Sequence, residues 1–219
     1  MFTAMLVLAS NSPRRQMLLS LQGWQFEVHP TRVDESPFPD ETPKDYVLRL
    51  ASEKSLSASR EGPADRIVIG ADTAVVDGDR ILGKPADPFE AEAMLLSLQG
   101  RTHQVITGLA VCLLAPDRLL TDWCVTQVTM RQYSHAEVRA YVASGDPIDK
   151  AGAYAIQHEL FNPVERITGC YANVVGLPLC HLTKLLQGLN LDLRQDLTRD
   201  CLAPEGYNCQ LVEMILKNS

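Results

Sequence analysis

Two patterns of apolar residues alternate along this chain of 219 residues. Some segments are short and almost continuously apolar, which is typical of strands buried in a sheet. In other segments apolar residues recur every three or four positions, which is typical of a helix with one buried face. The continuous runs predict strands at 5–9, 67–76, 81–82, 104–114 and 122–131.

The helical segments are bounded by residues that favour helix ends. Ser12 precedes Pro13, so the serine can cap a helix in which proline takes the first position. Ser134 and Glu137 have the spacing of a capping box. On the same grounds we predict helices from Pro13 through Leu21, from Pro43 to about Arg60, from Pro88 to Gly100, from Ser134 to Gly145, and after Pro178.

The predicted strands and helices interleave without a strict strand–helix–strand alternation. This order favours an α/β fold in which helices flank a mixed β-sheet. No internal repeat, low-complexity tract or Gly/Ser linker divides the sequence, so we predict one domain over residues 1–190. Residues 191–219 show no clear pattern and are interpreted as a C-terminal extension of unknown role.

The charge balance narrows the classes of function. The chain has 20 Lys and Arg residues against 27 Asp and Glu residues, a net charge of −7. General nucleic-acid binding and binding to an anionic membrane both need an excess of Lys and Arg, so any site for a polyanion must be a local basic cluster. The sequence has no signal-peptide pattern, no bilayer-spanning apolar run and no C-x-x-C pair. We therefore expect a cytoplasmic protein with reduced cysteines.

The turn from the first strand to the first helix is a candidate phosphate-binding site. It reads Ser-Asn-Ser-Pro-Arg-Arg over 10–15. A helix N-terminus offers free backbone N–H groups, and the forked guanidinium groups of Arg14 and Arg15 match phosphate oxygens. An ordinary capped helix with two solvated arginines explains the same residues, so both interpretations stay open at this point.

Asp72 is the second candidate, because it interrupts a strongly apolar strand. A buried carboxylate is costly unless a cation or hydrogen bonds satisfy it. Such a carboxylate either binds a divalent cation or activates water, or it simply bonds backbone amides at a bend. Glu35 lies in a Pro-rich connection and gains interest only as a partner of Asp72 around a metal ion.

Three lysines complete the set of candidate residues. Lys54 extends the apolar stripe of its helix, so it either snorkels to the surface or enters a polar pocket. Lys84 follows a strand in a Gly-Lys-Pro turn, and Lys150 follows Asp149 in another turn-like stretch. Each alone is an ordinary surface lysine. Together with Arg14 and Arg15 they make a focused anion site plausible on an acidic protein.

Taken together, these segments resemble the Maf family of nucleotide pyrophosphatases. The matching pieces run in order over residues 5–190, and the shared order and spacing make the set far more specific than any single piece. They are Ser10-x-Ser12-Pro-Arg-Arg15, Val33-Asp-Glu35, Ala51-x-x-Lys54, Gly70-Ala-Asp-Thr73, Gly83-Lys-Pro85, His103-x-Val105-x-Thr107, Asp149 to Gln157 and Tyr171-x-Asn-Val-Val-Gly-Leu-Pro178.

The resemblance implies an inosine-triphosphatase-like fold, with an elongated mixed sheet and helices around a deep cleft. It also implies hydrolysis of a nucleoside triphosphate to the monophosphate and pyrophosphate with a divalent cation, Mg²⁺ or Mn²⁺. Asp72 would be the general base, and Glu35 would help Asp72 to hold the metal. Arg14, Lys54 and Lys84 would neutralise the phosphates, and we expect Ser10 and Lys150 to contact the substrate.

The substrate is also suggested by the resemblance. The Gly-Ala-Tyr-Ala-Ile-Gln form that ends at Gln157 resembles the branch that acts on dTTP and UTP. In that branch the residues that match Arg15, Thr73 and Gln157 are associated with base selection. An amide both donates and accepts hydrogen bonds, as the uracil and thymine edge requires. Action on modified pyrimidine nucleotides, a house-cleaning role, is implied as well.

Two alternatives remain beside this hypothesis. The protein could prefer 7-methyl-GTP, as another branch of the family does, or it could be a regulatory binding protein linked to inhibition of septum formation. We also expect a homodimer. The chain departs from the family pattern in the bulky segment 158–163, in Cys170 and in the extension with Cys201 and Cys209.

Overall fold

The apolar runs form one mixed β-sheet of seven strands in the part of the chain that the structure describes. The structure is a computed structural model, and it describes residues 5–115, 117–189, 201, 207, 209, 214 and 215. The strand order is β2-β1-β3-β5-β6-β7, with β4 paired to β3. The strands are β1 (Leu6–Leu8), β2 (Phe26–Val28), β3 (Ile67–Asp77), β4 (Arg80–Leu82), β5 (Thr102–Leu113), β6 (Arg118–Met130) and β7 (Val164–Thr168).

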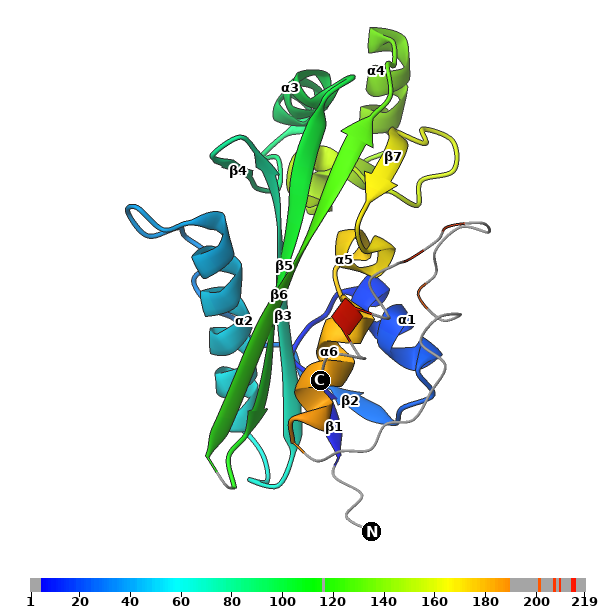
Figure 1. Cartoon of the computed structure of the whole chain (residues 1–219). Coiled ribbons are helices and arrows are strands. Elements are labelled where there is room, and N and C mark those ends of the chain that lie inside the picture. The colour runs from blue at the N-terminus through cyan, green and yellow to red at the C-terminus, as the bar shows by residue number, and fades with distance from the viewer. Residues whose placement is uncertain are drawn as a thin grey trace.

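Helices cover both faces of this sheet (Figure 1). Helix α2 lies on one face against β3 and β5, whereas α5 and α6 contact β5 and β6 on the other. Helices α3 and α4 pack on each other at one end of the long strands (Figure 1). The helices are α1 (Pro13–Leu21), α2 (Pro43–Ser59), α3 (Pro88–Leu98), α4 (His135–Ala143), α5 (Tyr171–Val175) and α6 (Leu179–Gln187), with short 3-10 helices η1 (Asp146–Asp149) and η2 (Ala151–Ala153).

The helix boundaries follow the capping residues of the sequence. Ser12, Thr42 and Asp87 each accept a hydrogen bond from the backbone N–H three residues later, and a proline follows each of them. The capping box of Ser134 and Glu137 is complete. The predicted mixed sheet and its flanking helices are therefore confirmed.

The start of one strand was predicted four residues too late. Strand β6 begins at Arg118 rather than 122, because Leu119 and Leu120 pair with Cys112 and Val111 of β5. The two strands pair along the whole length of β5. Strand β6 is therefore longer than the pattern of apolar residues in its own sequence indicates. The turn between the two strands includes Pro116, which is outside the described residues.

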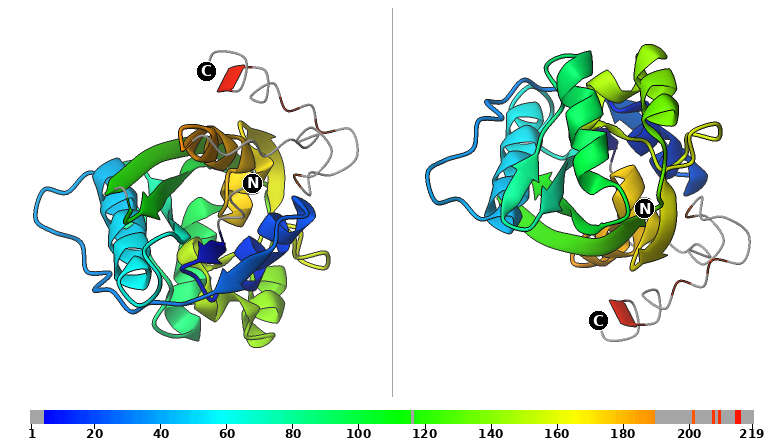
Figure 2. Two further views of the ribbon diagram at one scale, coloured as in Figure 1. Left: turned by 90° about the horizontal axis from the view of Figure 1, so that it is seen from below. Right: turned by 90° about the horizontal axis from the view of Figure 1, so that it is seen from above.

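Two large hydrophobic clusters occupy the two ends of the long strands. One gathers buried residues of β1, α1, α5, α6 and the turn between the last two helices, including Leu8, Leu18 and Leu177. The other gathers residues of α3, α4 and β4, including Leu82 and Leu95. Strands β3 and β5 contribute to both clusters, and the views along the sheet show how the helices surround it (Figure 2). The middle of β3 thus lies between the two hydrophobic clusters.

Two glycines allow α2 to approach the sheet closely. A Cβ atom on Gly70 would lie 2.1 Å from the carbonyl oxygen of Ala51, and one on Gly108 would lie 2.5 Å from that of Val47. Both contacts are far shorter than any real carbon–oxygen contact, so only glycine fits at these positions. As a result the α2 backbone rests directly on β3 and β5, next to Asp72.

Most of the extension 191–219 lies outside the described residues. Two of its described members contact the domain: Cys201 is buried in the cluster that includes Leu177, and Tyr207 packs against that cluster. The Tyr207 hydroxyl donates a hydrogen bond to the backbone oxygen of Gly169. Among the described residues no helix has both the length and the apolar character to cross a membrane.

Candidate active site

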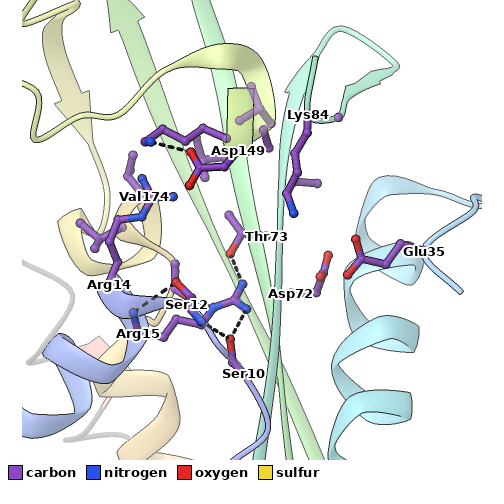
Figure 3. Close-up of a pocket in the computed structure, with 18 of the residues that line it drawn as sticks. Ser10, Ser12, Arg14, Arg15, Glu35, Asp72, Thr73, Lys84, Asp149 and Val174 are labelled. Carbon is purple, nitrogen blue, oxygen red and sulfur yellow. Dashed lines mark hydrogen bonds and ion pairs between the residues drawn. The ribbon is translucent and has the colours of Figure 1, made fainter. Parts of the chain in front are cut away.

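A cavity of about 690 Å³ lies beside the middle of β3. Its walls come from the turn before α1, from β3, from the segment after β4, from η1 and η2, and from the end of α5 (Figure 3). The lining residues include all but one of the candidates from the sequence: Ser10, Arg14, Arg15, Glu35, Lys54, Asp72, Thr73, Lys84 and Lys150. Residues 140 positions apart in the sequence therefore share one site.

The central feature is a lysine between two carboxylates. The Nζ atom of Lys54 donates hydrogen bonds to Oδ1 of Asp72 at 2.6 Å and to Oε1 of Glu35 at 2.7 Å. The side chains of Lys54 and Asp72 are only 10% and 11% exposed, whereas that of Glu35 is 52% exposed. Lys54 follows the buried stripe of α2 and enters the polar pocket, which was one of the two alternatives for it.

The pKa values of Asp72 and Glu35 are shifted in opposite directions. Burial raises the pKa of Asp72 above its ordinary value, against the opposing charges of Lys54 and Arg15. Burial alone would also raise the pKa of Glu35, but the hydrogen bond and charge of Lys54, with the charges of Lys84 and Arg15, bring that pKa below its usual value. Two carboxyl groups with separated pKa values are typical of sites where one takes up a proton and the other stays charged.

The serine–arginine turn is braced by its own side chains. The buried Oγ of Ser10 accepts hydrogen bonds from the Ser12 N–H and from Nη1 of Arg15, both at 3.2 Å. Arg15 also donates from Nη2 to Oγ1 of Thr73 at 3.1 Å and from Nε to the oxygen of Gly176 at 2.9 Å. Burial lowers the pKa of Arg15, yet a guanidinium keeps its charge in proteins. Arg15 therefore ties α1, β3 and α5 together at the cavity.

Arg14 and Lys84 are the cations left to meet a ligand. They line the cavity from α1 and from the segment after β4, and Lys84 extends toward the two carboxylates (Figure 3). Neither side chain has a hydrogen bond or ion pair with the residues that the structure describes. Since the first turn of α1 also faces the cavity, an anion would meet two side-chain cations and the positive end of a helix.

Lys150 has a different environment from Lys84. Its Nζ atom donates to Asp149 Oδ1 at 2.6 Å, to the backbone oxygen of Asp146 at 2.6 Å and to Asp146 Oδ1 at 3.0 Å. Two carboxylates thus already balance its charge, although it lines the cavity. Its predicted contact with substrate stays a prediction.

Gln157 is the one candidate that the structure does not bring to the cavity lining. Its side chain is half-buried and lies close to the phenol of Tyr171 in α5, whose pKa it lowers against the larger opposing effect of burial. The predicted role of Gln157 in base selection therefore stays a prediction. Of the three residues assigned to base selection, Arg15 and Thr73 line the cavity.

Several lining residues were not predicted. Tyr46 lies on α2, and Tyr154 forms a 2.7 Å hydrogen bond with the buried His103, whose pKa burial lowers to about 4. Behind Thr73, the hydroxyl of Thr107 is 2.9 Å away and donates to the backbone oxygen of Asn173. The sequence did contain a signal for four of these residues, because the motifs quoted above include them: His103, Thr107, Tyr154 and Asn173.

The donor set suits a cation that arrives with phosphate. Among the described residues no group of three or more His, Cys, Asp and Glu side chains has the arrangement of a metal site. Asp72 and Glu35 nevertheless offer two carboxylates at one point of the cavity, as their shared hydrogen bonds to Lys54 show. Mg²⁺ commonly takes one or two carboxylates and completes its shell with substrate phosphates and water. The residues thus fit such a cation.

Comparisons with known proteins agree with this geometry. The family model described as "Maf-like protein" matches residues 5–189. A dTTP/UTP pyrophosphatase of Geotalea uraniireducens is 47% identical over 182 residues, which cover 83% of this chain and 93% of that protein. A dTTP/UTP pyrophosphatase of Bacillus cereus is 44% identical over 188 residues, covering 86% of this chain and 97% of that protein.

One solved structure resembles part of the fold. It is a nucleoside-triphosphatase / dITP/XTP pyrophosphatase from Mycobacterium abscessus, with a TM-score of 0.38 and 12% identity over 59% of this chain and 75% of that chain. The family match, by contrast, spans nearly the whole described domain, and the relatives are similar over almost their full length. This chain belongs to the Maf family.

Proposed function

We propose that this protein hydrolyses dTTP and UTP to the nucleoside monophosphate and pyrophosphate. The observation that carries this proposal is the buried Asp72–Lys54 pair, with Glu35, at the wall of a cavity that also presents Arg14 and Lys84. A carboxylate that can take a proton thus lies beside cations that can hold a polyphosphate. The names of the relatives in Geotalea uraniireducens and Bacillus cereus support the choice of nucleotides.

The triphosphate would be bound by the cations that the protein leaves available. Arg14 would hold it from the α1 side and Lys84 from the opposite wall. The first turn of α1 would add backbone N–H groups to the same anion. The whole chain has a net charge of −7, but these groups create a local positive potential at the cavity. The protein can therefore bind a polyanion there without a generally basic surface.

Asp72 would act as the general base. In the reaction, a water molecule attacks the α-phosphorus, its proton passes to the Asp72 carboxylate, and the bond from the α-phosphorus to the bridging oxygen breaks so that pyrophosphate leaves. The raised pKa of Asp72 makes it a better proton acceptor than an ordinary aspartate. Lys54 holds one of its oxygens in place, and Lys84 and Arg14 stabilise the charge that develops on the phosphate oxygens.

A divalent cation, Mg²⁺ or Mn²⁺, would be held by Glu35 and Asp72 together with the phosphates. When bound, it supplies neutralisation of phosphate charge. Glu35 is suited to this part because its lowered pKa keeps it ionised. Its half-exposed side chain also reaches the cavity from a segment outside the sheet.

Selection of the base would involve Arg15, Thr73 and Gln157. Arg15 and Thr73 are hydrogen-bonded to each other at the cavity, so they form a fixed surface there. Gln157 would have to turn from Tyr171 toward the base, or act through that tyrosine. The homodimer, the cytoplasmic location, the domain boundary at 190 and action on modified pyrimidine nucleotides are further proposals of the same hypothesis.

Release of pyrophosphate from a nucleotide panel tests the proposed function. We expect dTTP and UTP to be hydrolysed with at least about tenfold higher kcat/KM than CTP, ITP, GTP and 7-methyl-GTP, in the range that pocket contacts provide. The assay would contain Mg²⁺ or Mn²⁺, with EDTA as the control for the cation. Activity on 7-methyl-GTP alone would keep the mechanism and overturn the choice of substrate. No activity from folded protein would favour the regulatory binding protein.

Lys84→Ala tests the binding of the phosphates. Because Lys84 is exposed and has no partner among the described residues, its loss should leave the unfolding temperature unchanged. The loss of a charge-assisted contact with phosphate should lower kcat/KM for dTTP about 10- to 100-fold. Steady-state kinetics and thermal unfolding measure both effects. Lys44→Ala is a matched control, because Lys44 lies on α2 over the ring of Trp123 and does not line the cavity.

A further inference from the structure

The segment that carries Glu35 lacks regular secondary structure. It runs over residues 29–42, between β2 and α2, and contains neither a helix nor a strand. No ladder of backbone hydrogen bonds therefore fixes Glu35, and most side chains of the segment are exposed. Nevertheless Glu35 reaches the buried Lys54 at 2.7 Å. Other contacts must hold the segment in place.

Arg49 of α2 makes most of these contacts. Its Nε and Nη2 atoms donate to the two carboxylate oxygens of Glu41 at 2.6 and 2.8 Å, a bidentate pair. Nη2 also donates to the backbone oxygen of Ser36 at 3.1 Å, and the guanidinium lies 4.0 Å from the centre of the Phe38 ring. One side chain thus contacts three residues of the six that follow Glu35.

The segment and α2 reinforce this arrangement from both sides. The hydroxyl of Tyr46, one helical turn before Arg49, donates to the backbone oxygen of Glu35 at 2.9 Å. Within the segment, the N–H of Phe38 donates to the Glu41 carboxylate at 3.1 Å. Hydrogen bonds from Arg49 lower the pKa of Glu41, so the pair stays ionised at neutral pH. Tyr46, Arg49 and Lys54 thereby present one side of α2 to residues 35–41.

We propose that Arg49 is a positioning residue that holds residues 35–41 on α2 and so presents Glu35 to the cation that accompanies the triphosphate. Arg49 does not line the cavity, so it acts through Glu35 and touches no reacting group. Part of this inference rests on the proposed function, since it assigns Glu35 to the cation. The packing of the segment by Arg49 stands on the contacts alone.

Arg49→Met in the full-length protein removes the bidentate pair and the bond to Ser36 while keeping an unbranched apolar side chain. We expect amide hydrogen exchange at Phe38 and Glu41, whose N–H groups are hydrogen-bonded within the segment, to become about tenfold faster or more, as local opening becomes easier. The Mn²⁺ concentration for half-maximal dTTP hydrolysis should rise about 5- to 20-fold. At saturating Mn²⁺, kcat and the KM for dTTP should return to within about twofold of the unsubstituted protein, since the reacting groups are intact.

A matched control is Arg101→Met. Arg101 also forms a two-point pair, with Asp77 at 2.8 and 3.0 Å, but it immediately precedes β5 and has no hydrogen bond or ion pair with residues 35–41. Glu41→Gln should reproduce part of the effect of Arg49→Met, since the Arg49 contacts with Ser36 and Phe38 remain. The double variant should be no worse than Arg49→Met, because Glu41 acts through Arg49. Arg49→Lys should restore part of the Mn²⁺ response.

The outcomes separate this inference from the proposed function. Faster exchange in Arg49→Met, but not in Arg101→Met, supports the packing role even if no nucleotide is hydrolysed. Unchanged exchange overturns it. If dTTP is hydrolysed and Arg49→Met lowers kcat at saturating Mn²⁺ without shifting the Mn²⁺ response, Arg49 has a general structural role and the link to the cation is wrong.

Discussion

Asp72→Asn lowers kcat for dTTP hydrolysis by about 10²- to 10⁴-fold, the usual contribution of a general base. Asparagine has the same shape and its carbonyl oxygen still accepts the hydrogen bond from Lys54, which is 2.6 Å from the aspartate oxygen. It cannot, however, take the proton of the attacking water. We therefore expect the loss to appear mainly in kcat at saturating Mn²⁺ and dTTP, as measured by pyrophosphate release, and thermal unfolding checks that the variant is folded.

The pH dependence gives an independent reading of the same residue. A base must be deprotonated to act, so kcat/KM falls as the pH decreases through the pKa of Asp72. Because burial raises that pKa, the fall begins at a higher pH than an ordinary aspartate would give. The residual activity of Asp72→Asn should lack this acidic limb.

Asp77→Asn is the control for this experiment. Asp77 ends the same strand and pairs with Arg101 outside the cavity, so its loss should leave kcat within about twofold. Retention of more than a tenth of the activity by folded Asp72→Asn would assign the base to another group. A regulatory binding protein would keep its cellular effect in this variant.

Lys54→Met destabilises the fold by about 3–5 kcal/mol, the cost of removing one partner from a buried ion pair. Methionine fills a similar volume on α2, so the loss arises from the Asp72 carboxylate, which stays buried without its cation. The measurement is urea unfolding at neutral pH, analysed for the change in midpoint at constant slope. Activity should be lost together with the stability.

The loss in Lys54→Met should depend on pH in a definite direction. Without Lys54, the pKa of Asp72 in the folded state lies even further above its unfolded value, so the folded variant binds more protons than the unfolded chain. Its free energy of unfolding then falls as the pH rises through this interval. Acidification protonates Asp72 and removes the unpaired charge, so the difference from the unsubstituted protein shrinks as the pH decreases.

Lys84→Ala provides the contrast, because Lys84 lines the same cavity but is exposed. It should reduce activity with no loss of stability. Equal stability of Lys54→Met and the unsubstituted protein at neutral pH would contradict the buried ion pair as a stabilising contact.

Much of the fold could be predicted because local signals determine it. Proline and capping residues mark the starts of α1, α2, α3 and α4, and each of these helices begins where they stand. Strands β2 and β7 and helix α5 were not predicted. They are three to five residues long, too short for a periodic pattern, and they exist because neighbouring strands and the core provide partners.

The residues of the site could be predicted from the sequence, but the hydrogen bonds and ion pairs between them could not. Glu35 and Asp72 are far apart in the sequence, and only the packing of α2 brings them to one lysine. Arg15 was assigned to substrate binding, which stays a prediction, but its hydrogen bonds to Ser10 and Thr73 could not be foreseen from the sequence. Arg49 was not considered, because nothing in its spacing shows that it reaches back to Glu41.

The close packing of α2 on Gly70 and Gly108 makes the distance between helix and sheet part of the proposed catalytic arrangement. These glycines touch no substrate, yet they set the gap between helix and sheet and with it the reach of Lys54 to Asp72. A single methyl group at either position would widen that gap before it altered any reacting group. Turnover therefore depends on the thickness of the scaffold as well as on the reacting groups, and two residues without side chains set that thickness.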